Sequence, residues 1–149
     1  MREDIGLFRG RRIDNGEWVE GYLVVTPEDK EGKEFAYWII SGLDYMGSIY
    51  DAPMAAEPVD PATVGEYTGL KDKNGKRVFE GDIVVYDNTP YNAYGHRVIG
   101  AIVWRKWAWK LKYTEYGSVF HYAIGSEDFF HAKSEVIGSI HDNPELLEV

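Results

Sequence analysis

The chain has 149 residues, a formal net charge of −9 and no cysteine. The lack of cysteine excludes disulfide bonds and cysteine-ligated zinc sites. The acidic balance disfavours non-specific binding to nucleic acid or to an anionic membrane, but it does not exclude a local basic patch. Aromatic residues make up 15% of the chain, with 11 Tyr and 5 Trp, and rings of this size fit the faces of sheets. The composition therefore predicts a mainly β protein.

The first residues, "MREDIGLFRGRR", hold charges where a secretory signal would need an apolar run. The longest apolar stretches, "FAYWIISGL" and "VIGAIVW", are shorter than the roughly 20 residues that cross a bilayer. We therefore expect a soluble, cytoplasmic protein with no membrane partner.

The N-terminal part of the chain predicts a hairpin, a loop and a third strand. Residues 7–25 are expected to form the hairpin, because Asn15 and Gly16 accept the positive φ of a tight turn. Residues 26–34 are polar and contain Pro and Gly, which predicts a loop. Residues 35–42, "FAYWIISG", predict the third strand.

Residues 44–66 are interrupted by three prolines, Pro53, Pro58 and Pro61. Because proline lacks the N–H that a helix or a central strand requires, we predict a surface crossing or linker here. The domain boundary follows from it. We expect an N-terminal β-hairpin region at 1–62 and a C-terminal, barrel-like β region at 63–149, which together make one compact unit.

The C-terminal part predicts a series of short strands around a second Asn-Gly turn, and it ends in a helical turn with Asn143 as N-cap and Pro144 at its first position. The expected strands lie at 67–71, 76–87, 97–113, 117–125 and 134–141, with a loop at 88–96 and a loop or helical turn at 126–135. No helical periodicity is sustained over more than about 12 residues. The predicted fold class is mainly β, with roughly seven to nine strands in several short antiparallel, strongly coiled sheets or small, partly open barrels.

Two segments of the chain share a pattern of glycines. "FRGRRIDNGEWVEGYLV" and "YTGLKDKNGKRVFEGDIV", residues 8–24 and 67–84, both contain a Gly, a turn Gly and a Glu-Gly pair at nearly equal spacing. The similarity indicates either a structural repeat of two hairpins or the ordinary clustering of Gly and Asn in turns.

These motifs also point to a family. "VGEYTGLKDKNGKRVFEGDIV", "FRGRRIDNGEWVEGYL" and "EVIGSIHDNPELLE" together resemble the YopX family of phage and prophage proteins. Residues 26–60 and 88–134 contribute little to the resemblance. It implies a mainly β fold with several strongly coiled sheets and a gene carried by a phage or an integrated prophage. The family has no established activity, so the resemblance supplies no catalytic residue.

Acidic residues and histidines offer the first candidates for chemistry. Glu80 and Asp82 would share one face of a strand, where paired carboxylates could bind a metal or transfer protons. Asp128 would lie near His131 in a helical turn. For both pairs we favour a structural interpretation, because no histidine motif with metal-ligand spacing is present. No GxSxG motif and no phosphate-binding glycine loop occurs either. We therefore predict no catalytic residue, metal or cofactor.

The strongest candidate surface is "WRKWAWKLKY", residues 104–113. As one continuous strand it would place Trp107, Trp109, Leu111 and Tyr113 on one face and Lys106, Ala108, Lys110 and Lys112 on the other. With Arg105, these lysines form a candidate binding surface. We favour a half-buried strand with solvated lysines over a nucleic-acid surface, because the rings would face away from the lysines.

Three functional hypotheses follow. The first is a non-catalytic module that binds an unidentified host or phage protein. The second is a protein that binds single-stranded nucleic acid through Arg105, Lys106, Lys110 and Lys112, which the net charge disfavours. The third is an enzyme of unrecognised type built on Asp128 and His131 or on Glu80 and Asp82. Exposed sheet edges also permit homo-oligomers.

Overall fold

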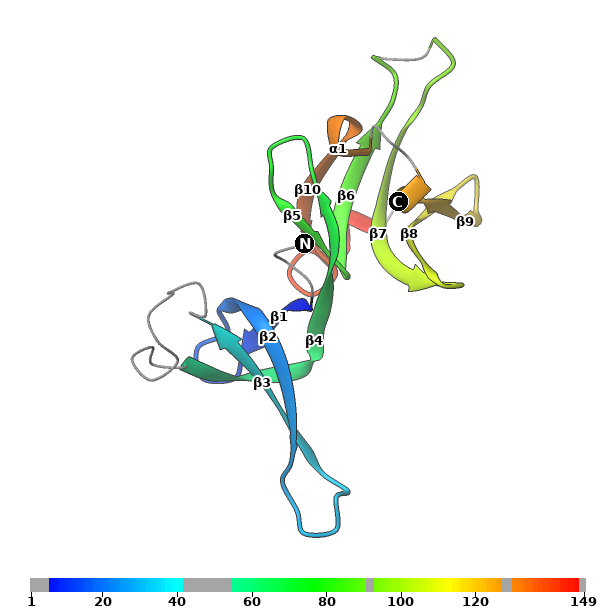
Figure 1. Cartoon of the computed structure of the whole chain (residues 1–149). Coiled ribbons are helices and arrows are strands. Elements are labelled where there is room, and N and C mark those ends of the chain that lie inside the picture. Colours follow the sequence, from blue (N-terminus) through cyan, green and yellow to red (C-terminus); the bar gives the residue numbers. More distant parts are fainter. Residues whose placement is uncertain (1–5, 42–54, 91–92, 127–129, 148–149) are drawn as a thin grey trace. The chain divides into compact units, whose positions relative to one another are not determined.

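The computed structural model describes residues 6–41, 55–90, 93–126 and 130–147 (Figure 1). Within these ranges every strand pairing is antiparallel, and no helix is long and apolar enough to cross a membrane. The strands are β1 (Leu7–Arg12), β2 (Trp18–Pro27), β3 (Phe35–Ser41), β4 (Ala55–Lys71), β5 (Arg77–Phe79), β6 (Asp82–Asp87), β7 (Arg97–Arg105), β8 (Ala108–Glu115), β9 (Ser118–Ala123) and β10 (Ser134–Ser139). The helical segments are η1 (Ile124–Ser126), α1 (Phe130–Lys133) and η2 (Pro144–Leu147). The predicted mainly β class and the helical turn near the C-terminus are confirmed.

The chain divides into two compact units, Met1–Tyr67 and Thr68–Val149, and the long strand β4 contributes to both. In the first unit the strands pair in the order β1-β2-β3-β4, and β4 also pairs with β1. The pairings therefore close into a ring. Ile39 and Val59 lie almost fully buried in this unit, where their burial provides the apolar contacts that hold a strongly coiled sheet together.

Strand β4 contradicts the prediction of a linker, because it runs through Pro58 as a paired strand between β3 and β1. The Pro58 carbonyl accepts a hydrogen bond from the Ile13 N–H, 3.0 Å away. Because the N–H and C=O of an extended residue point to the same side, the missing donor of Pro58 faces Ile13, beyond the end of β1. The missing N–H of Pro58 therefore removes no hydrogen bond from the pairing of β4 with β3. The third proline, Pro53, lies outside the described residues.

Pro61 is accommodated differently, in an irregularity of the β1–β4 pairing. The register moves from Arg9↔Gly65 to Arg11↔Asp60, so extra residues of β4 bulge out of the ladder. The buried Thr63 hydroxyl repairs the bulge, since it accepts from the Arg11 N–H at 2.8 Å and donates to the Asp60 carbonyl at 2.7 Å. A proline inside such a bulge needs no ladder donor.

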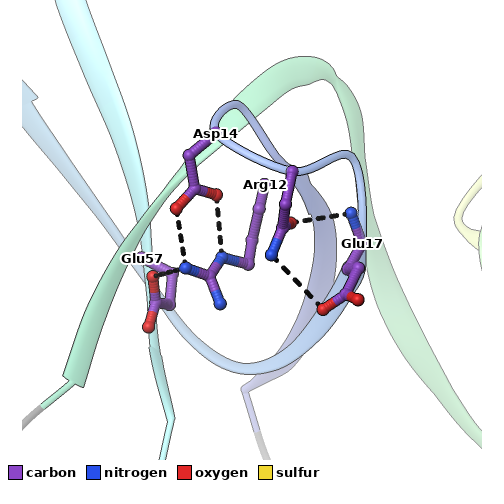
Figure 2. A network of polar contacts seen from close by, with 5 residues as sticks. Arg12, Asp14, Glu17 and Glu57 are labelled. Atoms are coloured by element: carbon purple, nitrogen blue, oxygen red, sulfur yellow. Dashed lines mark hydrogen bonds and ion pairs between the residues drawn. The ribbon is translucent and has the colours of Figure 1, made fainter.

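The β1–β2 turn is held by the polar network of Figure 2. Arg12 donates two hydrogen bonds to the Asp14 carboxylate, at 3.0 and 2.7 Å, and contacts Glu57 of β4 at 3.0 Å. Hydrogen bonding to Arg12 lowers the pKa of Asp14, and the same bond raises the pKa of Arg12. The Asn15 side chain accepts from the Glu17 N–H at 2.9 Å. The predicted hairpin around Asn15-Gly16 is therefore confirmed. The charged side chains of this turn form hydrogen bonds and ion pairs with one another and with Glu57 of β4.

In the second unit a five-stranded sheet has the order β10-β6-β7-β8-β9. Its buried core includes residues from strands, η1 and α1: Val78, Val84, Tyr86, Val98, Ile102, Leu111, Ile124 and Phe130. Val78 comes from β5, so the β4–β5 hairpin adds its apolar side to the core of this sheet. The sheet is a stable platform for the side chains of its outer strands.

Two buried carboxylates tie the turns of this unit to the sheet. The Asp72 side chain accepts 2.9 Å hydrogen bonds from the N–H groups of Asn74, Lys76 and Val136, which joins the β4–β5 turn to β10. The Asp82 carboxylate accepts from the Phe79 N–H at 2.7 Å. Both side chains act as fixed acceptors for backbone donors, in the way that an Asx turn does.

Candidate binding surface

Residues 104–113 form a hairpin, and the prediction of one continuous strand is wrong. β7 ends at Arg105 and β8 begins at Ala108, and these two residues pair across the turn. Lys106 and Trp107 occupy the two turn positions with φ of 51° and 64°. Positive φ at both positions is the geometry of a type I′ turn, which matches the twist of the flanking strands. The sequence did not indicate this turn because Lys and Trp are not residues that favour positive φ.

The predicted alternation holds within β8 itself. Leu111 is fully buried in the core, and Trp109 and Tyr113 pack against that core from the same face. Lys110 and Lys112 therefore point to the opposite face. Lys110 pairs with Val103 of β7, and Lys112 pairs with Ala101. The neighbouring side chains across the ladder are therefore small or medium in size.

The structure places His121 on this surface, although the strand pattern of residues 104–113 does not include it. A second two-residue turn, Tyr116 and Gly117, joins β8 to β9 and sets the pairing of Lys112 with His121 (Figure 1). His121 thus lies on the lysine face. Because a two-residue hairpin pairs residues equidistant from its turn, recognition of the Tyr-Gly turn would have placed this histidine from sequence.

The two hairpins bring all the predicted site residues around His121. The guanidinium Nη1 of Arg105 lies 2.9 Å from Nε2 of His121. Since a guanidinium only donates, Nε2 of the imidazole accepts this bond and therefore carries no proton. The pKa of His121 is lowered from its ordinary value of 6.5, first by desolvation and then by the charges of Arg105, Lys112, Lys110 and Lys106. We name Arg105, Lys106, Lys110, Lys112 and His121 the basic patch.

Among the described residues, no ion pair to a carboxylate offsets the lysine charges of the basic patch, at Lys106, Lys110 and Lys112. Arg105, Lys106 and Lys112 are exposed, and Lys110 is half-buried. Four like charges held together raise the local potential, which lowers the pKa of His121 and attracts anions.

Aromatic rings are exposed at the ends of the same strands. Trp107 is 90% exposed at the β7–β8 turn, and Tyr116 is 96% exposed at the β8–β9 turn. Trp104 is half exposed and contacts Trp109 edge-on, with ring centroids 5.0 Å apart. Trp107 therefore does not join the inward-facing rings, contrary to the prediction from alternation.

The Glu80 and Asp82 pair does not form the shared carboxylate face that a strand would give. Glu80 and Gly81 form a turn, with φ of 87° at Gly81, and only Asp82 belongs to β6. Asp82 is 1% exposed and binds the Phe79 N–H, whereas Glu80 is exposed. Asp82 therefore has a structural role, as we favoured for this pair, because its carboxylate binds backbone.

The other pair, Asp128 and His131, is only half described, because Asp128 lies outside the described residues. His131 is exposed in the short helix α1. Across the described ranges, no group of three or more His, Asp and Glu side chains could hold a metal ion.

A second surface feature lies in the first unit, on β2, β3 and β4. It is an apolar depression of about 340 Å³ lined by Val24, Thr26, Trp38, Ile40 and Ala56. The Trp38 indole N–H donates to the Thr26 hydroxyl at 3.0 Å, which fixes the ring in the depression. None of these lining side chains is charged, and the depression offers mainly apolar contact area.

Fold and surface together define a mainly antiparallel β protein with a local basic patch on an acidic chain. The model of the family described as YopX protein matches residues 7–148, and the chain belongs to the YopX family. The chain is also similar to the crystal structure of protein EF1440 from Enterococcus faecalis, with 28% identity over 95% of this chain and 96% of that chain and a TM-score of 0.46. No curated protein matches it.

Proposed function

We propose that this YopX-family protein is a non-catalytic binding protein that engages a polyanionic partner through the basic patch. The observation that supports the proposal most is the gathering of Arg105, Lys106, Lys110 and Lys112 around His121, where Nη1 of Arg105 lies 2.9 Å from Nε2 and Lys112 is the cross-strand partner of His121. Gathering four cations costs electrostatic free energy, because like charges repel. A polyanion would remove that repulsion and release counterions on binding.

Charge distribution supports the same function. The chain has a formal net charge of −9, so acidic residues elsewhere repel polyanions. Binding is thereby restricted to the basic patch, which favours one orientation of the partner over non-specific adhesion.

A binding role also accounts for the residues better than catalysis does. The Asp82 carboxylate binds backbone in the core, and His121 is held neutral as an acceptor for Arg105. In this arrangement the Asp82 carboxylate and Nε2 of His121 both serve as hydrogen-bond acceptors within the fold. We further propose that the gene belongs to a phage or prophage, as the family resemblance implies, and the identity of the neighbouring genes tests this.

The binding proposal is tested with a double variant, Lys110→Glu with Lys112→Glu, and fluorescently labelled inorganic polyphosphate. At low salt the wild-type protein should bind, and the variant should bind at least about tenfold more weakly, because two attractive charges become repulsive. The slope of log affinity against log salt should fall by roughly 1.4, at about 0.7 for each lost contact on a flexible polyanion.

The matched control is Lys30→Glu with Lys76→Glu, which makes the same change of charge at two exposed positions outside the basic patch. This control should keep most of the affinity. Circular dichroism should show that both double variants are folded. Lack of polyphosphate binding by the wild-type protein, or equal weakening in both double variants, would overturn the proposal.

A further inference from the structure

The β7–β8 turn holds two residues, Lys106 and Trp107, in a backbone conformation that is unfavourable for their residue types. Lys106 and Trp107 both have positive φ, which costs L-residues roughly 1–2 kcal/mol each because of contact between Cβ and the carbonyl oxygen. Asn-Gly, which accepts positive φ at both positions, would form the same turn at lower cost. A Trp at such a position is unusual enough to require a physical reason.

Burial does not supply that reason. The Trp107 side chain is 90% exposed, so it returns little of the free energy that a buried indole provides. The other exposed turn ring, Tyr116, is followed by Gly117, which takes one of the two positive φ values at low cost. The β7–β8 turn thus presents a large flat ring beside Lys106 at a cost that the β8–β9 turn partly avoids.

The position of Trp107 also answers the objection that sequence alternation raised against nucleic-acid binding. Stacking requires a ring that is accessible next to the cations. Trp107 meets this requirement because it sits in the turn between Lys106 and Ala108, away from the inward-facing Trp109. Lys110 and Lys112 continue from the turn along one face of β8, about 7 Å apart, since each residue of a strand advances about 3.4 Å. Successive phosphates of an extended nucleic-acid strand have a comparable separation.

We propose that the polyanion is a single-stranded nucleic acid, with one base stacked on Trp107 and its phosphates along Lys106, Lys110 and Lys112. This inference rests on the proposed function and names its partner. An acidic protein would satisfy the charges but would make no use of a flat exposed indole. A duplex would satisfy the phosphate contacts, but its bases already stack on one another and cannot reach the ring.

The test compares four labelled probes at low salt: a short oligothymidylate, an oligouridylate, a DNA duplex of mixed sequence and polyglutamate. The wild-type protein should bind one or both single strands more tightly than duplex or polyglutamate. Trp107→Ala should weaken single-strand binding about tenfold, the expected loss for one stacked base. Trp107→Tyr should retain most of the affinity because it keeps a ring.

Tyr116→Ala is the matched control, since it removes a ring of similar exposure that stands beside Glu115 at the opposite end of β8. It should leave the affinity for single strands unchanged. The salt slope of Trp107→Ala should also stay at the wild-type value, because no phosphate contact is lost.

The outcomes separate this inference from the proposed function. Polyphosphate binding that depends on Lys110 and Lys112, together with equal oligonucleotide affinity in wild type and Trp107→Ala, would overturn the stacking proposal and leave the function standing. Tighter binding of polyglutamate than of either single strand would identify an acidic protein as the partner class and overturn it as well. Absence of binding to every anionic probe would overturn both.

Discussion

The segments 8–24 and 67–84 share a glycine pattern, and the structure shows that of the matched glycines only the turn glycines, Gly16 and Gly75, share a conformation. Gly16 and Gly75 have φ of 72° and 78°. The Gly16 N–H donates to the carbonyl of Arg12, four residues earlier, at 2.9 Å, whereas the Gly75 N–H donates to the carbonyl of Asp72, three residues earlier, at 3.0 Å. Both glycines therefore close a hairpin by taking the left-handed conformation that glycine adopts without strain.

The other matched glycines differ in conformation and in what surrounds them. Gly69 has φ of 83° within β4, while its counterpart Gly10 is outside the left-handed region and lies against Val59. Gly81 has φ of 87° in a turn, while Gly21 lies within β2, close to the backbone of Ile40. Equal spacing thus marks a turn glycine of the same conformation, whereas the flanking glycines are needed for torsion in one segment and for close approach in the other.

Replacing the Glu-Gly glycines with alanine should break the comparison most strongly. In Gly21→Ala the new Cβ would overlap the Ile40 carbonyl, so the β2–β3 pairing must shift, at roughly 3 kcal/mol or more. In Gly81→Ala the nearest atom to the new Cβ would be 3.6 Å away, and only the positive φ is penalised, by about 1–2 kcal/mol. Hydrogen exchange at β2 and β6, read separately by mass spectrometry, measures the two effects. A larger loss of protection in Gly81→Ala would contradict the distinction.

Position 72 should give the next largest effect. Asp72→Ala removes the acceptor of three backbone N–H groups and should cost about 2–3 kcal/mol in urea denaturation. Asp72→Asn keeps one oxygen for the turn, so it should lose less. The residue 59 positions earlier is Ile13, which is 66% exposed, and Ile13→Ala should cost less than about 0.5 kcal/mol. Similar losses at the two positions would show that the hairpins are held in the same way.

Local turn chemistry explains which parts of the fold could be predicted. Asn15-Gly16 and Asn74-Gly75 placed two hairpins correctly, because the glycine of each dipeptide takes the positive φ that its turn requires. The strand through Pro58 could not be predicted, because proline is tolerated there only by the direction in which its absent donor points. That direction is a property of the pairing with β1 and β3, which no local pattern contains.

The same limit applies to the basic patch. Arg105, Lys106, Lys110 and Lys112 were recognisable as a cluster in the sequence, and the alternation in β8 gave the correct face for Lys110 and Lys112. The turn at Lys106-Trp107 was missed because its residues contradict turn preferences. His121 was missed because its place depends on the register between β8 and β9.

The smallest effect concerns the one feature that the two hairpins share. Gly16→Ala and Gly75→Ala should each cost about 1 kcal/mol, since φ is positive at both positions and no atom lies within 4 Å of either new Cβ. Asn tolerates the left-handed region better than Ala, so Gly16→Asn and Gly75→Asn should each recover part of the loss. Urea denaturation of the four variants measures these differences. Losses for the two alanine variants that agree within about 0.5 kcal/mol would support a common turn, because additional contacts at either glycine would add a further cost. A difference above about 1 kcal/mol would show that even this turn is held by different interactions in the two hairpins.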